Sequence, residues 1–143
     1  ELKAAEGKGD IPDVPKALPA LSRAAKVGKK AAKVGFDWPE IAGPLTKLQE
    51  EVDELGHAIE HEGHDRVADE LGDVLFAAVN VARHAAVDPE LALRGTTERF
   101  LERFQWVRNT LREQGVELGR DDVSSATLDA LWEEAKRTCD RPR

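Results

Sequence analysis

The sequence contains little of what secreted, disulfide-stabilised or membrane-spanning proteins need. Its 143 residues include a single cysteine, Cys139. One cysteine cannot close an internal disulfide, and no histidine stands near Cys139 in the sequence to activate it as a nucleophile. No apolar run approaches the roughly 20 residues that cross a bilayer, and the first ten residues lack the apolar segment of a signal peptide. We therefore expect a cytoplasmic protein with no membrane partner.

The sequence also has fewer basic than acidic residues. Lysine and arginine together number 21 against 28 aspartates and glutamates, which gives a formal net charge of -7. A sequence-independent nucleic acid interface needs a basic surface, and so does adsorption to an anionic membrane. We expect neither partner. A free nucleotide is still compatible with this charge if cations bridge it to the protein.

The apolar pattern predicts one all-α domain, because no strand pattern or internal repeat occurs. Residues 1–17 are rich in glycine, proline and charge and are interpreted as a flexible N-terminal tail or linker, and residues 139–143 as a C-terminal tail, which leaves a domain at 18–138. Within it the sequence predicts helices at 21–34, 44–59, 67–86, 89–94 and 96–113, and a last one that begins at Ser124 or Ser125.

Two of these predicted helices carry apolar stripes that we expect to face a core. The stripe of the second helix is Leu48, Val52, Leu55 and Ile59, and that of the third is Val67, Leu71, Val74, Ala78 and Val81. The third helix is apolar on most of its other faces as well, which is typical of a helix buried in a bundle or in an oligomer.

Two features near the start of the domain allow both a structural and a functional interpretation. Four lysines, at positions 26, 29, 30 and 33, recur on one face of the first helix, either as an ordinary solvated face or as an edge that faces phosphate. The loop that follows carries Phe36 and Trp38. These aromatic rings either cap the core or stack on a nucleobase.

Two acidic runs fall on consecutive predicted helices. Glu50, Glu51 and Glu54 share one arc of the second helix, opposite its apolar stripe, and Glu70 and Asp73 lie one turn apart on the third. Like charges three or four residues apart repel each other, so this arrangement indicates a cation between the helices. Mg²⁺ prefers carboxylate and water oxygens and commonly bridges to phosphates. Five carboxylates would suffice for one to three such ions.

The same residues allow other interpretations. An ordinary solvated acidic face is common on helices. A di-iron bundle needs two Glu-x-x-His motifs, and only Glu54 to His57 fits one. His57, His61 and His64 resemble part of a zinc site, but no sulfur ligand joins them, and histidines near the Gly63 turn are more often solvated. Magnesium is therefore preferred to iron and zinc.

The order of these motifs resembles the MazG family of nucleoside triphosphate pyrophosphohydrolases. The similar segments are residues 33–39, the Glu-Glu-x-x-Glu run at 50–54, residues 70–84, the Arg-Phe-x-x-Arg-Phe run at 99–104, and residues 131–136. The resemblance covers roughly residues 18–137 and is far more specific than either acidic run alone. The chain most resembles the C-terminal catalytic domain of longer members, standing alone or cut from a longer protein.

The resemblance implies an all-α helical bundle, completed by dimerisation, that hydrolyses standard or non-standard nucleoside triphosphates to the monophosphate and pyrophosphate. It implies Mg²⁺ as cofactor, with Mn²⁺ as a candidate substitute, and a homodimer or a higher homo-oligomer. By position, the catalytic and metal-binding residues would be Glu50, Glu51, Glu54, Glu70 and Asp73. The residues that contact substrate would be Lys33, Trp38, Asn80, Arg99, Arg103, Trp132 and Lys136.

One position departs from the family pattern. Arg99 stands where a lysine is common, and a planar guanidinium binds phosphate differently from the point charge of an ammonium. A second function, from another class, is also open. The chain could be a helical dimer that binds a nucleotide or a protein partner without hydrolysis, with the acids as a solvated or regulatory face.

Overall fold

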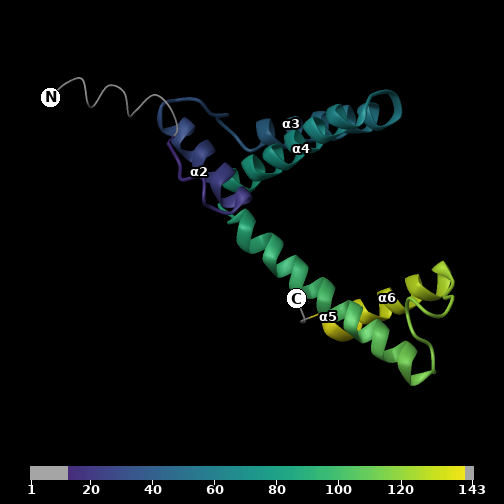
Figure 1. The fold of residues 1–143 in the computed structure, drawn as a ribbon. Helices are drawn as coiled ribbons and strands as arrows, with labels where there is room; N and C mark the ends of the chain where they lie inside the picture. The colour runs from purple at the N-terminus through teal and green to yellow at the C-terminus, as the bar shows by residue number, and fades with distance from the viewer. Residues whose placement is uncertain (1–12, 141–143) are drawn as a thin grey trace. The chain divides into compact units, whose positions relative to one another are not determined.

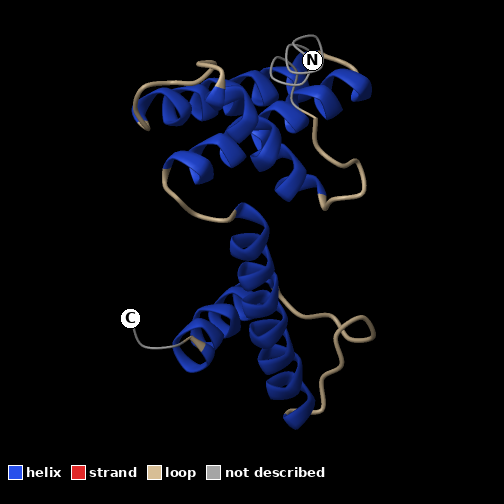
Figure 2. Cartoon of the chain, turned by 90° about the vertical axis from the view of Figure 1, so that its left-hand side faces the viewer, coloured by secondary structure: helices blue, strands red, loops and turns tan. Residues whose placement is uncertain are grey.

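The computed structural model describes residues 13–140, and within that range every regular element is a helix (Figure 1, Figure 2). The helices are α2 (Ala20–Lys33), α3 (Ala42–His61), α4 (His64–His84), α5 (Pro89–Glu113) and α6 (Ser125–Cys139). The predicted all-α class is confirmed. Between residues 13 and 140, no helix combines the length and the hydropathy that crossing a membrane requires.

The predicted tails lie mostly outside the described residues, which exclude 1–12 and 141–143. Within the predicted N-terminal tail, Val14 is buried, and the first described helix begins at Ala20, close to the predicted start at residue 21. At the other end, α6 includes Cys139. The domain limits of 18 and 138 stay predictions.

The chain divides into two compact units, and the boundary falls inside α5, between Ala92 and Leu93. In the first unit, α3 and α4 lie side by side (Figure 1). Only residues 62 and 63 separate the two helices, and the backbone N–H of Glu62 donates to Ala58 in the last turn of α3. Helix α2 packs against α4. This pairing brings the two acid-bearing helices together.

The helices of the first unit turn different faces inward from those that their apolar stripes predict. Val52 and Ile59 of α3 are 50% and 63% exposed, and Leu71 of α4 is 46% exposed. The buried residues of α3 are Pro44, Glu51 and Ala58, and those of α4 are Glu70, Ala77, Val79 and Asn80, so none of them belongs to the predicted stripes. The prediction that the apolar stripes form the core is therefore wrong for Val52, Ile59, Leu71 and Ala78, which are all exposed, because α3 and α4 meet through their acidic faces.

In the second unit, a small apolar core joins α5 to α6. Val107 and Leu111 of α5 are buried with Ala135 of α6, and Leu128 and Trp132 pack partly buried against them. The predicted start of α6 is confirmed, and Ser124 caps the helix, since its side chain accepts the backbone N–H of Thr127. This core gives α6 a fixed face against α5.

Helix α5 corrects another prediction. It is one continuous helix from Pro89 to Glu113 rather than a short helix followed by a longer one. Its start is as predicted, with Asp88 Oδ1 accepting the backbone N–H groups of Glu90 and Leu91 at 2.9 and 3.1 Å. The helix continues through Gly95 because a glycine costs only about 1 kcal/mol in a helix interior, whereas a proline would have stopped it.

Candidate functional site

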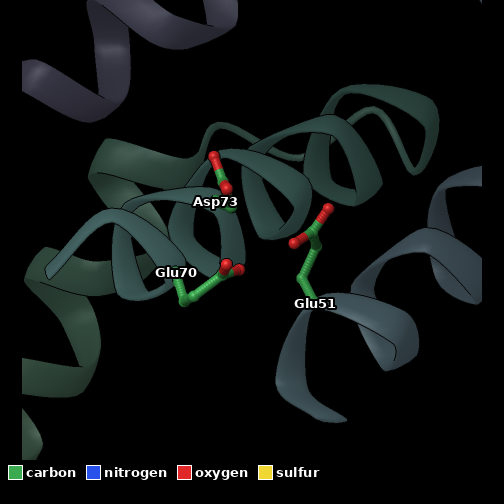
Figure 3. Close-up of side chains that lie close together, drawn as sticks. All are labelled: Glu51, Glu70 and Asp73. Carbon is green, nitrogen blue, oxygen red and sulfur yellow. The ribbon is translucent and has the colours of Figure 1, made fainter. Parts of the chain in front are cut away.

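Three carboxylates from the paired helices converge on one point. Glu51 rises from α3 toward α4, where Glu70 and Asp73 lie one turn apart (Figure 3). One oxygen from each side chain can be chosen so that all three lie within 4.8 Å of one another. Oxygens at this spacing can share a single cation. The predicted approach of the two acidic runs is therefore confirmed for these three residues.

Burial separates this cluster from an ordinary acidic surface. Glu51 is 6% exposed and Glu70 is 3% exposed. The Oε2 atom of each is buried and has no hydrogen-bond partner within the described residues. Leaving a charged oxygen buried and unpaired costs free energy, at least about 1–3 kcal/mol. Asp73 is exposed and keeps one side of the cluster open to solvent. An all-carboxylate donor set with two unsatisfied oxygens fits a hard divalent cation.

Two basic side chains flank the cluster. Lys47 Nζ lies 2.7 Å from Glu51 Oε1, one turn earlier in α3, and 3.8 Å from Glu50 Oε2. Arg66 Nη2 lies 2.5 Å from Glu70 Oε1, one turn earlier in α4. The hydrogen bond to Glu51 and the charge of that carboxylate raise the pKa of Lys47 above its ordinary value. Each buried glutamate therefore has one oxygen paired with a basic side chain and one oxygen without a partner within the described residues.

The two remaining predicted ligands lie at the margin. The negative charge of Glu51, some desolvation and the charge of Glu70 raise the pKa of the Glu54 carboxyl above its ordinary value. Glu54 is thus within the field of the cluster, although it is exposed. Glu50 is also exposed and lies near Lys47 rather than among the three converging carboxylates.

A cavity of about 480 Å³ adjoins the loop between α2 and α3. Its walls include the aromatic rings of Phe36, Trp38 and Phe76 and the polar side chains of Asp37, Asn80 and Arg83. Of the predicted substrate residues, Trp38 and Asn80 therefore lie together in the first unit. Asn80 is 6% exposed and accepts a hydrogen bond of 3.3 Å from Arg83. Lys33, the last residue of α2, is exposed and does not line this cavity.

The loop that carries Trp38 is tied to the end of α4. Asp37 accepts two hydrogen bonds of 2.8 Å from Arg83, lies 2.9 Å from the ring Nε2 of His84, and accepts the backbone N–H of Trp38. These hydrogen bonds, that from Arg83 first, hold the pKa of Asp37 well below its ordinary range. The Trp38 ring lies directly on Gly43, where an added Cβ would come within 2.3 Å of it. The position of the ring is therefore fixed on two sides.

The other predicted substrate residues belong to the second unit. The Arg103 guanidinium lies 5.8 Å from the centroid of the Trp132 ring and donates to Asp140 at 3.0 and 2.7 Å. Lys136 lies one turn beyond Trp132 and donates to Glu133 at 3.0 Å. Arg99 is exposed and donates to Thr96. Arg103, Trp132 and Lys136 thus form a cationic and aromatic patch on α5 and α6.

Sequence reasoning missed Lys47 and Arg66. Both precede a buried glutamate by four residues, and this spacing brings opposite charges together on a helix. That signal was present in the sequence, but it is equally common between exposed residues. Only the burial of Glu51 and Glu70 gives the two basic residues their importance.

Comparison with known proteins gives a family match and several relatives. Residues 43–111 match the family model described as MazG nucleotide pyrophosphohydrolase domain. The Nucleoside triphosphate pyrophosphohydrolase of Escherichia coli (strain K12) is 37% identical over 129 residues, which are 89% of this chain and 48% of that protein. The Nucleoside triphosphate pyrophosphohydrolase/pyrophosphatase MazG of Thermotoga maritima is 39% identical over 119 residues, 83% of this chain and 45% of that protein.

A further relative carries no functional name. The Uncharacterized protein YabN of Bacillus subtilis (strain 168) is 46% identical over 129 residues, which are 90% of this chain and 26% of that protein. The chain spans about half the length of the Escherichia coli and Thermotoga maritima relatives that it matches.

Proposed function

We propose, because residues 43–111 match the model of the MazG nucleotide pyrophosphohydrolase domain, that this chain hydrolyses nucleoside triphosphates to nucleoside monophosphate and pyrophosphate. The observation that carries the proposal is the cluster of Glu51, Glu70 and Asp73, whose oxygens lie within 4.8 Å of one another on the matched segment. A polyphosphate cannot approach such a cluster unless positive charge lies between them. A cation bound to the cluster would supply this positive charge. The cluster therefore suits an enzyme that acts on triphosphates.

The cation proposed for this site is Mg²⁺, with Mn²⁺ as a substitute. Glu51 and Glu70 hold it from two different helices, and the exposed Asp73 lies on the solvent side. Glu50 and Glu54 are proposed as further ligands on the same face of α3. When bound, such an ion neutralises phosphate charge and lowers the pKa of a coordinated water. Carboxylates that the ion leaves free would accept the proton of the attacking water.

The cavity of the first unit is proposed to bind the nucleoside. Trp38 offers an aromatic plane for stacking, and the buried amide of Asn80 offers hydrogen bonds in an apolar surround. Lys33 at the end of α2 is proposed to contact phosphate. In the second unit, Arg99, Arg103, Trp132 and Lys136 are proposed to contact the phosphates or the base, which suits a cationic and aromatic patch.

A homodimer or a higher homo-oligomer is proposed from the exposed apolar residues of α3. Leu45, Val52 and Ile59 are all exposed and recur at every seventh position. A seven-residue apolar repeat is typical of a helix that packs along another helix. With the acidic face of α3 turned toward α4, a second copy of the chain is the partner proposed to cover this stripe.

One observation favours a second candidate function. Lys47 and Arg66 each neutralise one oxygen of a buried glutamate. Internal ion pairs of this kind need no metal. A helical dimer that binds a nucleotide or a protein partner without hydrolysis would retain the same cluster for structural reasons.

Product analysis separates the two candidates. The chain is incubated with standard and deaminated nucleoside triphosphates, with Mg²⁺, with Mn²⁺ or with EDTA, and the phosphorus products are followed by ³¹P NMR. We expect monophosphate and pyrophosphate in equal amounts, only with a divalent cation. Inorganic phosphate with diphosphate would contradict the proposed cleavage position. Nucleotide binding without any product would favour the second candidate.

A further inference from the structure

The two glutamates at the heart of the carboxylate cluster each have one paired and one unpaired oxygen. Glu51 Oε1 lies 2.7 Å from Lys47 Nζ, and Glu70 Oε1 lies 2.5 Å from Arg66 Nη2. The second oxygen of each, Oε2, is buried and has no partner within residues 13–140. The cluster is therefore only partly neutralised by the chain itself.

The two basic residues differ from the glutamates in exposure. The side chains of Lys47 and Arg66 are 44% and 56% exposed, whereas those of Glu51 and Glu70 are 7% and 4% exposed. Each basic residue lies four residues before its glutamate on the same helix, so its long side chain reaches the carboxylate from outside. A flexible, solvated cation can leave such a contact by rotating its side chain, whereas the buried carboxylates cannot follow it into water.

We propose that Lys47 and Arg66 are internal counter-ions that a divalent cation displaces when it binds to Glu51, Glu70 and Asp73. The inference rests on the proposed function, because it assumes that the cluster binds a cation. Without the ion, the ammonium and guanidinium groups limit the repulsion between two buried carboxylates. With the ion bound, the carboxylates would interact with its double positive charge instead. Lys47 and Arg66 therefore compete with the metal and weaken its binding.

Displacement has a thermodynamic signature that an ordinary ion pair lacks. A ligand that binds only the folded state stabilises it by a free energy that grows with the logarithm of its affinity. If the metal displaces Lys47, removing the lysine destabilises the metal-free protein and tightens metal binding by an equivalent amount. If Lys47 stays paired with Glu51 in both states, its removal lowers stability equally with and without the metal.

The test uses Lys47→Gln and Arg66→Gln in the full chain. Binding of Mg²⁺ alone is measured by isothermal titration calorimetry, and binding of Mn²⁺ alone by electron paramagnetic resonance. We expect each variant to bind the metal about threefold to tenfold more tightly than the wild type, in line with the modest worth of partly exposed ion pairs. The melting temperature should fall in EDTA and return to the wild-type value at saturating Mg²⁺.

Arg112→Gln is the matched control. Arg112 forms a two-bonded ion pair with Glu117 in the second unit, at 2.8 and 2.7 Å, so the variant removes one positive charge and one ion pair far along the chain. Its metal affinity should equal that of the wild type. Should Lys47→Gln fail to fold without metal, Arg66→Gln carries the test, because Arg66 is the more exposed of the two.

The outcomes distinguish this inference from the proposed function. If the wild type binds the metal and both variants bind it with unchanged or weaker affinity, the displacement is overturned and the metal site is retained. An equal loss of melting temperature with and without Mg²⁺ would also overturn it. A wild type that binds neither Mg²⁺ nor Mn²⁺ would overturn both proposals together.

Discussion

The guanidinium group of Arg83 holds the carboxylate of Asp37 through two hydrogen bonds of 2.8 Å, and so ties the loop before α3 to the C-terminal end of α4. A two-bonded pair of this kind is among the stronger side-chain contacts in proteins. Because Asp37 also accepts the backbone N–H of Trp38, the pair fixes an aromatic wall of the 480 Å³ cavity.

Replacing Asp37 tests this tie. Asp37→Asn should lower the free energy of unfolding at pH 7 by about 1–3 kcal/mol, because Arg83 and His84 lose a charged partner. Chemical denaturation measures this loss. Asp129→Asn, a change at an exposed position of α6, is the control and should leave stability within about 0.5 kcal/mol of the wild type.

The same pair predicts a pH dependence. The pKa of Asp37 is lowered from 3.8 chiefly by the hydrogen bonds of Arg83. A depressed pKa contributes stability that is fully present above the unfolded-state value and is lost as pH falls through the folded-state value. The difference in stability between wild type and Asp37→Asn should therefore be largest above about pH 4–5 and shrink toward lower pH. A difference that grows on acidification would contradict the assignment.

Gly28 predicts a local clash. A Cβ at this position of α2 would lie 3.0 Å from Arg83 Nε and 3.2 Å from Asn80 Oδ1. Gly28→Ala should therefore displace the Asn80 amide and raise the KM for nucleotide. Gly28→Ala should also fail to show the increase of about 0.5–1 kcal/mol in the free energy of unfolding that alanine normally gives in a helix interior. Gly95→Ala in α5, where an added Cβ meets Arg99 only at 3.5 Å, should show that gain by thermal denaturation.

The exposed stripe of α3 predicts the oligomeric state. Light scattering after size-exclusion chromatography should give at least twice the mass of one chain. Val52→Asp with Ile59→Asp should yield monomers, because two charges would be buried unpaired in the proposed interface. Val34→Asp, at a residue that is also exposed but outside the stripe, should leave the mass unchanged. A monomeric wild type would contradict the proposed assembly.

Lys136 tests the proposed role of the second unit. Lys136→Gln should raise the KM for nucleotide by roughly tenfold with little change in melting temperature, because the ion pair to Glu133 is exposed and contributes little to stability. Arg137→Gln, the adjacent exposed residue, removes the same charge and should not change KM. Equal effects of the two variants would indicate a general charge effect and contradict a specific contact.

Much of this architecture can be predicted from sequence because its signals are local. Helix starts follow from single capping residues, as Asp88 and Ser124 show. Glycines also mark helix ends, since Gly35 and Gly115 follow α2 and α5 with φ values of 89° and 76°, which favour glycine. The order of the motifs predicts a resemblance to MazG, and residues 43–111 match the model of that family.

The inward face of each helix could not be predicted in the same way. Periodicity finds the stripe that contains Val52 and Ile59, but it does not tell whether that stripe faces the core of its own chain or another surface. The structure buries Glu51 and Glu70 instead, a choice that depends on how α3 and α4 pair. For the same reason, the sequence does not show that Lys47 and Arg66 pair with buried glutamates.

The most direct test of the account compares two neighbouring carboxylates on α4. Glu70 belongs to the buried cluster, whereas Asp69 is exposed beside it. Glu70→Gln should retain its helical circular dichroism, lose Mg²⁺ binding, and lower pyrophosphate release from nucleoside triphosphates at least about 100-fold. Asp69→Asn should match the wild type in all three. Undiminished pyrophosphate release by Glu70→Gln, or an equal loss in Asp69→Asn, would contradict the proposal that this cluster is the catalytic metal site.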